Sequence, residues 1–505
     1  MDLKPKISHA LLKHFYAGKR QAFVLAAQDI EVAQRGRLDG ILRALAKTEK
    51  WSSLSAKTSY EEFSRQVPLR EYSDFASEIE QQRDTGRALL STHVTRWEPT
   101  SGSTEHRKWI PYSPSHLDDM NAAASVWLGD LYQNFSGLSG GRHYWSLSWL
   151  PESLRQITSA NDEELFPSYQ RWLLKNTMLM PAAVSTLPLA KQSWQATALL
   201  LLAEENLRFV FVWSPTFFLQ ILDTIEERWS EFCELLELGS WGDDDALIRR
   251  TLGPAPKRNL AGIESGNWKK VWPRLQLLSA WDSSSSEKWA NKLQRRLPGV
   301  EFQGKGLWAT EGVVTIPFED RKPLAFQSHF YEFIDLETDE VLPSWLVKKD
   351  KTYQPVLSCS NGLLRYKLAD RLLCTGYFET VPCFEFLGRI HSVDLVGEKI
   401  SVDFVKKIFE PLRDHEPICL LALHQPRPRY VLVCGQPGEV DIEAKLSAQH
   451  HYRLARELGQ LDAAEVVFSK NPAGYLSRLR PGSNEGQLKM DLLIEIPGDV
   501  REITP

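Results

Sequence analysis

A short polar segment at residues 100–108 has the composition of an anion-binding loop. It reads Thr-Ser-Gly-Ser-Thr-Glu-His-Arg-Lys, with one glycine among four hydroxyl residues and a lysine at position 108. The glycine lets the backbone approach a ligand closely, hydroxyls and amides can donate hydrogen bonds to phosphate oxygens, and Lys108 adds positive charge. The GxxxxGK[ST] signature is absent, so a P-loop hydrolase is not predicted, and a solvated loop is the alternative interpretation.

Two later segments place carboxylates beside predicted strands. Residues 307–312 read LWATEG and bring together an aromatic ring, a hydroxyl and a carboxylate just before a strand, and residues 362–370 read GLLRYKLAD and end a strand in an acid. An Asp at a strand end is most often a turn residue, so each segment alone is a weak signal. Phe386-Leu387-Gly388-Arg389 and Gly397-Glu398-Lys399 follow, and the order of all these segments favours one shared site.

Alternating strand and helix patterns predict an α/β protein. Residues 1–90 and 113–135 have helical periodicity, with Ser113 or Ser115 as a cap, and Phe217–Leu238 is also helical. Buried strands are predicted at 143–150 and 207–214. Further strands are expected at 313–318, 328–336, 363–368, 371–378 and 383–388.

The pattern changes again close to Arg389–His391, where we expect a domain boundary. Beyond it, short strands at 418–423 and 430–434 mix with helical stretches at Val402–Leu412 and Glu439–Leu458.

Composition excludes several classes of protein. The 505 residues carry 65 acids against 60 bases, a net charge of −5, which argues against nucleic-acid binding as the main function. No apolar run approaches the roughly 20 residues of a membrane span, and the N-terminus lacks the apolar core of a signal peptide, so a cytoplasmic protein is expected. The six cysteines form no CxxC pair, so a zinc site is not predicted. GxSxG is absent, which disfavours a serine hydrolase.

The ordered segments resemble the adenylate-forming enzymes, the superfamily of firefly luciferase, and within it the acyl-acid amido synthetases of the auxin-responsive Gretchen Hagen family, including its bacterial members. The similarity rests on TSGSTEHRKWIPYS, LWATEG, SHFYEFI, GLLRYKLADRLLCTGYF, FLGRIHSVDLVGEKIS and GQLK, and spans about residues 90 to 490. It implies a large N-terminal adenylation domain, 1–389, of α/β subdomains plus a β-barrel, and a small mobile α+β lid domain, 390–505, which rotates between two half-reactions.

The resemblance also implies an activity and its substrates. A carboxylic acid would attack the α-phosphorus of ATP to give an acyl-adenylate and pyrophosphate, and an amine, typically of an amino acid, would then displace AMP to form an amide. ATP and Mg²⁺ would be the cofactors, and a small acid and an amino acid the partners, with no nucleic acid and no membrane involved. The alternative is transfer of the acyl group to coenzyme A or to a carrier-protein thiol, and a second is a non-catalytic nucleotide-binding protein of the same fold.

The resemblance assigns roles to named residues. Ser101, Gly102, Ser103, Thr104 and Lys108 would hold the β- and γ-phosphates. Trp308 and Ala309 would border the adenine, Thr310 would contact the α-phosphate, and Glu311 would bind Mg²⁺ and act in catalysis. Asp370 would accept hydrogen bonds from the ribose hydroxyls, Arg389 would reach the nucleotide at the hinge, and Lys489 would bridge the carboxylate and the α-phosphate.

The same resemblance places an acyl pocket around Asn121–Trp127 and Phe211–Phe217 and an acceptor pocket between the two domains. The sequence departs from the family pattern at Glu105, where glycine is usual, and at Ala369, which replaces the glycine before the acid. His391 stands where Asp or Lys is common, and it would make the hinge sensitive to pH.

Overall fold

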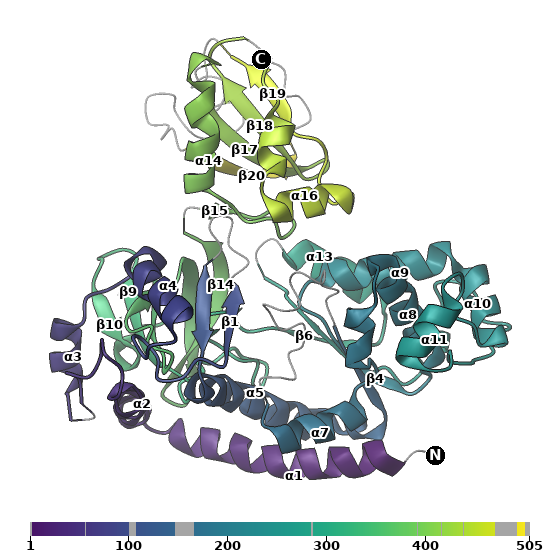
Figure 1. Cartoon of the computed structure of the whole chain (residues 1–505), viewed down its shortest axis with the longest axis horizontal. Coiled ribbons are helices and arrows are strands. Elements are labelled where there is room, and N and C mark those ends of the chain that lie inside the picture. The colour runs from purple at the N-terminus through teal and green to yellow at the C-terminus, as the bar shows by residue number, and fades with distance from the viewer. Residues whose placement is uncertain are drawn as a thin grey trace.

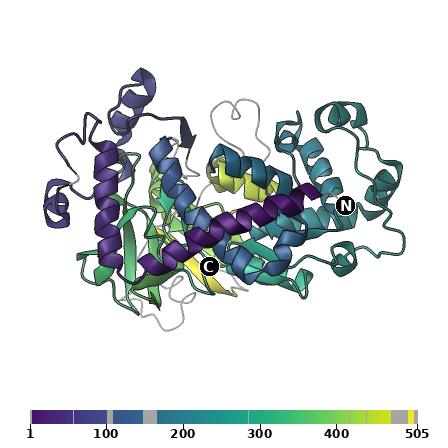
Figure 2. The same cartoon turned by 90° about the horizontal axis from the view of Figure 1, so that it is seen from below.

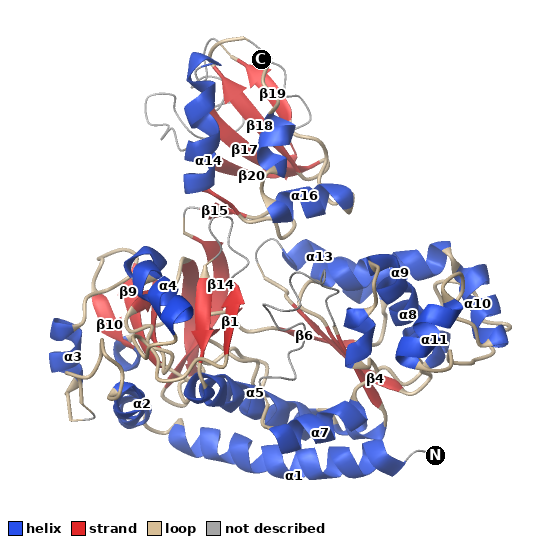
Figure 3. Cartoon of the chain, viewed as in Figure 1, coloured by secondary structure: helices blue, strands red, loops and turns tan. Residues whose placement is uncertain are grey.

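The computed structural model describes residues 3–55, 57–99, 108–146, 166–283, 286–390, 392–415, 417–437, 439–469 and 492–499. In Figure 1 these residues form two bodies side by side and a smaller C-terminal body above them. An antiparallel sheet is the centre of the lower left body and a parallel sheet covered by helices that of the lower right body (Figure 3).

A long N-terminal helix joins the two lower bodies. Helix α1 (Leu3–Ala26) crosses the underside of both (Figure 2) and packs against α5 (Pro114–Asn134) and α7 (Ser168–Thr177). The crossing with α5 is close, because a Cβ on Gly129 would lie only 2.5 Å from the carbonyl oxygen of Tyr16. The other helices of this region are α2 (Ile30–Leu45), α3 (Tyr60–Gln66) and α4 (Ala76–Thr85). Among the described residues no helix combines the length and the apolar character that crossing a bilayer demands.

The parallel sheet has the strand order β3-β4-β5-β6. Its strands are β3 (Arg142–Trp145), β4 (Leu207–Phe211), β5 (Leu277–Ala280) and β6 (Glu301–Gly304). Parallel neighbours require long crossovers, which here contain α8 (Ala190–Ala203), α9 (Pro215–Glu227), α10 (Trp229–Leu238), α11 (Asp245–Leu252), α12 (Trp268–Val271) and α13 (Glu287–Arg296).

The antiparallel sheet has the order β10-β9-β11-β13-β14, and β12 pairs with β11. Its strands are β9 (Phe330–Asp335), β10 (Val341–Pro343), β11 (Thr352–Ser358), β12 (Tyr366–Lys367), β13 (Asp370–Phe378) and β14 (Val381–Arg389). Two small hairpins accompany it, β1 (Arg96–Pro99) with β2 (Trp109–Tyr112) and β7 (Trp308–Ala309) with β8 (Gly312–Val313).

The C-terminal body begins with a short hairpin and continues into a four-stranded sheet of order β19-β18-β17-β20. Its elements are β15 (Ser392–Val393), β16 (Ile400–Ser401), α14 (Val402–Phe409), β17 (Pro417–Gln425), β18 (Arg429–Cys434), α15 (Ile442–Ser447), α16 (His450–Glu457), β19 (Glu465–Phe468) and β20 (Leu493–Asp499). Trp289 of α13 packs against the core of this body, so the body is in contact with the helices below it.

The predicted mixed α/β architecture is confirmed, and several elements match closely. Ser113 is the cap of α5, since its Oγ accepts a hydrogen bond from the His116 amide at 3.2 Å. The long helix expected at Phe217–Leu238 is instead two helices that part at Arg228. The strand expected at 313–318 is regular only at its start in β8, and isolated antiparallel bridges continue it, Thr315 with Leu324 and Phe318 with Arg321. Within 143–150, the part beyond Ser146 lies outside the described residues.

Two buried histidines join α1 to the parallel sheet. His9 contacts the Tyr132 hydroxyl and the Gly141 carbonyl, each at 2.8 Å, and His143 Nε2 lies 3.0 Å from the Leu138 carbonyl. Burial lowers the pKa of His9 to about 4 and that of His143 to about 3, so both rings are neutral in the folded protein.

We predict that the burial of His143 makes the free energy of unfolding decrease as the pH falls. The folded pKa of His143 lies below its unfolded value of about 6.5, so its contribution to stability is complete above that pH and is lost as the pH falls toward 3. His143→Gln, which can still donate to Leu138, removes this dependence. Between pH 6 and 4.5 the stability difference between wild type and His143→Gln, measured by urea unfolding, changes by about 1.4 kcal/mol per pH unit. His14→Gln, at an exposed position on α1, is the control and leaves the profile unchanged.

Candidate active site

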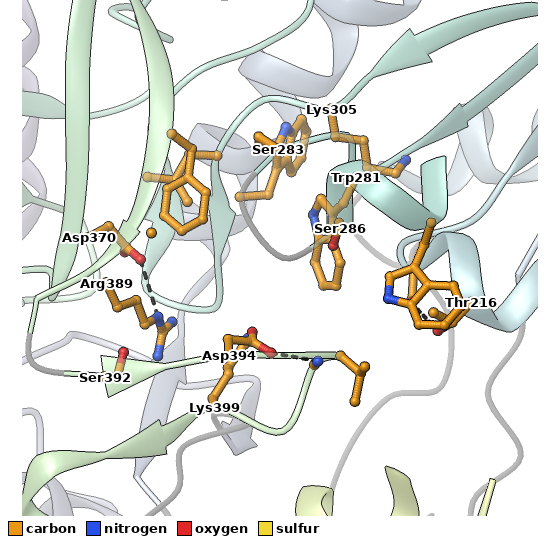
Figure 4. A pocket seen from close by; sticks show the side chains of 18 of the residues that line it. Thr216, Trp281, Ser283, Ser286, Lys305, Asp370, Arg389, Ser392, Asp394 and Lys399 are labelled. Atoms are coloured by element: carbon orange, nitrogen blue, oxygen red, sulfur yellow. Dashed lines mark hydrogen bonds and ion pairs between the residues drawn. The ribbon is translucent and has the colours of Figure 1, made fainter. Parts of the chain in front are cut away.

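A cavity of about 400 Å³ lies where the three bodies meet. The lower left body contributes β14 and the β7–β8 hairpin, the lower right body contributes residues of α9 and α13, and the C-terminal body contributes residues 392–399, α16 and β20. In Figure 4, Trp281, Ser283, Ser286 and Lys305 lie on one side of this space, and Asp370, Arg389, Asp394 and Lys399 lie on the other. Polar and charged groups from distant parts of the chain therefore share one cavity.

Four of the residues predicted from the sequence line this cavity, namely Trp308, Ala309, Asp370 and Arg389. Thr310 and Glu311 form the turn of the hairpin between β7 and β8. The predicted residues Ser101, Gly102, Ser103, Thr104 and Lys489 lie outside the described residues, as do Glu105 and His391. The segment that holds the predicted phosphate loop connects the paired strand ends Pro99 and Trp109.

Lys108 is placed, and it lies near an aromatic ring on the Glu311 side of the site. Its Nζ is 5.6 Å from the centre of the Tyr72 ring. The Tyr72 hydroxyl accepts a hydrogen bond from the Trp109 amide at 2.7 Å. Burial is the main cause of the raised pKa of Tyr72, and the Glu311 carboxylate adds to it, so Tyr72 lies within electrostatic range of Glu311.

The hairpin that carries Thr310 and Glu311 is held by side chains from other elements. Tyr112 donates a hydrogen bond to the Thr310 carbonyl at 2.9 Å, and the Leu307 amide donates to Thr315 Oγ1 at 2.8 Å. Tyr366 donates to Glu311 Oε1 at 3.0 Å, and burial beside this carboxylate raises the pKa of the phenol well above 10, so Tyr366 remains a donor. These contacts fix the direction of the Glu311 carboxylate.

An ion pair closes one end of the antiparallel sheet. Asp370 begins β13 and Arg389 ends β14, and the strand register places them opposite each other. Arg389 Nε lies 3.2 Å from Asp370 Oδ1, and the Asp370 side chain is only 3% exposed. Burial would lower the pKa of Arg389, but the carboxylates of Asp370, Glu311 and Asp394 outweigh it and raise that pKa. The guanidinium is thus within electrostatic range of three acids and in contact with Asp370.

The C-terminal body adds Asp394 and Lys399, which were not among the predicted site residues. The backbone of Lys399 is in the left-handed region, with a φ of 52°. Burial of its ammonium group, together with the positive charge of Arg389, lowers the pKa of Lys399. The turn that presents it is anchored by Glu398, whose buried carboxylate accepts hydrogen bonds from the Leu395 and Val396 amides at 2.8 Å and from the Tyr430 hydroxyl. The Gly-Glu-Lys triplet was visible in the sequence, but only the fold shows that its acid faces the core and its lysine the cavity.

Behind Trp308 lies a small apolar cavity of about 20 Å³ formed by aromatic rings. It is lined by Ala124, Trp127, Trp145, Phe166, Phe211, Trp213, Lys305, Trp308 and Pro317. The Lys305 ammonium lies 3.0 Å from the centre of the Phe211 ring and 4.6 Å from that of Trp213. The two segments in which an acyl pocket was predicted therefore meet here, next to the larger cavity, which Lys305 and Trp308 also line.

Comparison with known proteins identifies the family. Residues 19–302 match the GH3 family N-terminal domain, and residues 323–389 match the GH3 family central domain. The chain belongs to the GH3 family, and the resemblance predicted from the order of the motifs is confirmed.

Named relatives agree with this result. The indole-3-acetic acid-amido synthetase GH3.15 of Arabidopsis thaliana is 23% identical over 421 residues, which are 73% of this chain and 70% of that protein. The 4-substituted benzoates-glutamate ligase GH3.12 of the same plant is 21% identical over 407 residues, 72% and 70% of the two chains. The solved structure of Arabidopsis GH3.15 in complex with 2,4-DB superposes with a TM-score of 0.65 at 19% identity and covers 94% of this chain and 93% of that one, which shows the shared fold.

We predict that the base of the β7–β8 hairpin tolerates no side chain at Gly306. A Cβ there would lie 2.0 Å from the Thr315 carbonyl oxygen, so Gly306→Ala must push the two strands of the hairpin apart. Such overpacking lowers the free energy of unfolding by about 1–3 kcal/mol, measured by urea denaturation. Gly36→Ala is the matched control, because Gly36 is exposed in α2 with nothing near its Cβ position, and this change raises stability by about 1 kcal/mol. Equal effects of the two changes contradict the prediction.

Proposed function

We propose that this protein is an ATP-dependent acyl-acid amido synthetase, a ligase that joins a small carboxylic acid to the amine of an amino acid. The observation that carries the proposal is the convergence of Asp370, Arg389 and Lys399 on one cavity with Trp308 in its wall and Glu311 within electrostatic range. Acids and cations from three segments of the chain suit a nucleotide. Its negatively charged phosphates are stabilised by cationic side chains, and its ribose hydroxyls can donate hydrogen bonds to a carboxylate. The names of the GH3 relatives support the same reaction class.

The first half-reaction joins the acid to the nucleotide. An oxygen of the substrate carboxylate attacks the α-phosphorus of ATP, the bond from that phosphorus to the bridging oxygen breaks, and pyrophosphate leaves with the electron pair. In our proposal Asp370 accepts hydrogen bonds from the ribose, Trp308 and Ala309 border the adenine, and Thr310 contacts the α-phosphate. Arg389 and Lys399 offset the charge that gathers as two anions approach.

Magnesium fits the residues at the hairpin turn. Glu311 Oε1 accepts a hydrogen bond from Tyr366, while Oε2 accepts none from the described part of the chain, so a hard anionic oxygen is available to the cation. A bound Mg²⁺ would neutralise phosphate charge, and Glu311 is the residue we expect to hold it. The phosphate loop Ser101–Thr104, with Lys108, would hold the outer phosphates, and Lys489 would act at the α-phosphate.

The second half-reaction forms the amide. The amine nitrogen attacks the carbonyl carbon of the acyl-adenylate, the bond to the phosphate oxygen breaks, AMP leaves, and the nitrogen loses a proton. We propose that residues 1–389 form the adenylation domain and residues 390–505 a lid that rotates between the two steps. We expect the reaction in the cytoplasm, which fits the six free cysteines.

Two other functions share this fold. Transfer to coenzyme A or a carrier thiol is the first, and the relatives, which are named amido synthetases and a glutamate ligase, do not favour it. A nucleotide-binding protein without catalysis is the second, and the departures at Glu105 and Ala369 are the features that motivate it. The reaction products distinguish these functions. A thioester supports the first alternative, and the absence of pyrophosphate exchange with every acid supports the second.

We predict that adenylation depends on the Glu311 carboxylate. In an exchange assay that follows labelled pyrophosphate into ATP with a panel of aromatic and aliphatic acids, wild type is active with at least one acid. Glu311→Gln keeps the acceptor for Tyr366 but loses the negative charge, and its exchange rate falls by about 10²-fold. Glu337→Gln is the control, since Glu337 pairs with Lys351 on the surface. Wild type that exchanges with no acid in the panel refutes the proposed function.

We predict that the acceptor is an amino acid. Wild type is incubated with ATP, Mg²⁺, an acid active in the exchange assay, and either the twenty amino acids or coenzyme A. Mass spectrometry is expected to detect an acyl-amide and stoichiometric AMP only in the first mixture. A thioester formed faster than any amide supports the coenzyme A ligase instead.

A further inference from the structure

Three side chains of metal-binding type lie buried behind the hairpin that carries Glu311. One ligand atom from each of His116, His329 and Cys359 lies within 4.8 Å of the others, and all three side chains are fully buried. The bonding of His329 argues against a metal, because its Nε2 accepts a hydrogen bond from the Val313 amide at 3.2 Å. The His329 proton is therefore on Nδ1, while the lone pair of Nε2 accepts the hydrogen bond, so neither ring nitrogen is available to bind a metal ion.

The cluster instead contacts the backbone on both sides of Glu311. Cys359 Sγ donates to the Glu311 carbonyl at 3.5 Å, and His329 Nε2 holds the Val313 amide. These two contacts bind the peptide groups that flank Gly312. The Tyr331 hydroxyl donates to the Val313 carbonyl and so binds the next peptide group of the chain. The turn at Thr310–Glu311 itself has only two residues, and such a short connection transmits a displacement of β8 directly to Glu311.

Gly312 brings the hairpin against the imidazole. A Cβ on Gly312 would lie 2.7 Å from His329 Nε2, so only glycine allows this approach. The backbone of His329 is fixed in turn by Gln34 of α2, whose amide donates to the His329 carbonyl at 2.8 Å and whose oxygen accepts from the Tyr331 amide at 2.8 Å. Both ends of the contact are thus rigid.

On its far side His329 faces a buried ion pair. His329 Nδ1 lies 4.0 Å from Asp119 Oδ2, and Asp119 Oδ1 is paired with the Arg37 guanidinium. Within the described residues neither His329 Nδ1 nor Asp119 Oδ2 has a hydrogen-bond partner. A donor and an acceptor that are buried and complementary attract each other, so Asp119 favours the ring orientation and the tautomer in which Nε2 accepts from Val313.

We propose that His329 is a positioning residue for Glu311, which it holds at the geometry needed for a magnesium nucleotide by binding the Val313 amide from behind the hairpin. The proposal rests on the proposed function, because it assumes that Glu311 holds the cation. His329 touches neither nucleotide nor substrate, and it acts only through β8.

The test compares two substitutions of similar size. His329→Gln keeps an acceptor that can reach the Val313 amide, and His329→Met fills the same space without one. Calorimetry measures the affinity of each protein for a non-hydrolysable ATP analogue with and without Mg²⁺, and amide hydrogen exchange follows residues 307–315. We expect His329→Met to lose at least tenfold of the affinity gained from Mg²⁺, to bind the magnesium-free analogue within twofold of wild type, and to exchange the Val313 amide faster. We expect His329→Gln to remain within threefold of wild type in both measurements.

A His329→Met protein that folds, exchanges Val313 faster and still gains the full affinity from Mg²⁺ overturns the proposal, as does equal loss in both variants. Should His329→Met fail to fold, Cys359→Ala against Cys359→Ser replaces the pair, because serine keeps the donor to the Glu311 carbonyl, and the same loss is expected of alanine alone. Wild type that binds the analogue equally with and without Mg²⁺ refutes the assignment of Glu311 in the proposed function, a different outcome from failure at His329.

Discussion

The balance of charge in a half-buried cluster is the constraint on which the rest of this site depends. Arg389 is paired with Asp370, and the carboxylates of Glu311 and Asp394 act on its charge, as Arg389 in turn acts on that of Lys399, in a region from which much of the water is excluded. Isolated charges are costly in such surroundings, and only mutual pairing makes them tolerable. The elements that supply these residues must therefore come together. A negatively charged nucleotide can bind only where the acids do not fully neutralise the cations.

The architecture meets this constraint at a seam between three bodies. The register of β13 and β14 brings Asp370 opposite Arg389, the β7–β8 hairpin presents Glu311, and the C-terminal body contributes Asp394 and Lys399 from a single turn. Glu398 is central to that turn, since its buried carboxylate binds two backbone amides and the Tyr430 hydroxyl. Burial and the neighbouring Asp394 raise the pKa of Glu398, which shows how strongly this turn is removed from solvent. Movement of the C-terminal body would carry Lys399 with it as part of a rigid unit.

Support for the hairpin comes from residues with no chemistry of their own in the reaction. Tyr112 and Tyr366 bind the turn itself through the Thr310 carbonyl and the Glu311 carboxylate, whereas His329 and Cys359 bind the backbone that follows it. A two-residue turn with one carboxylate has little stability alone, so its precision comes from these neighbours. The same logic explains two glycines, Gly306 before the hairpin and Gly312 within β8, because a Cβ at Gly306 would strike the Thr315 carbonyl and a Cβ at Gly312 the His329 ring.

The sequence alone determined the family, the mixed α/β class and most strands of the antiparallel sheet, and it pointed to Trp308, Asp370 and Arg389, which line the cavity, because short motifs and strand periodicity are local properties of the chain. It did not determine Lys399, Asp394, Tyr366 or His329 as parts of the site. Each of these belongs to it only through contacts between residues distant in sequence, such as the 55 positions that separate Tyr366 from Glu311. Which side of a turn faces a cavity, and which buried histidine accepts from which amide, depends on packing between elements, and this is decided only when the tertiary structure forms.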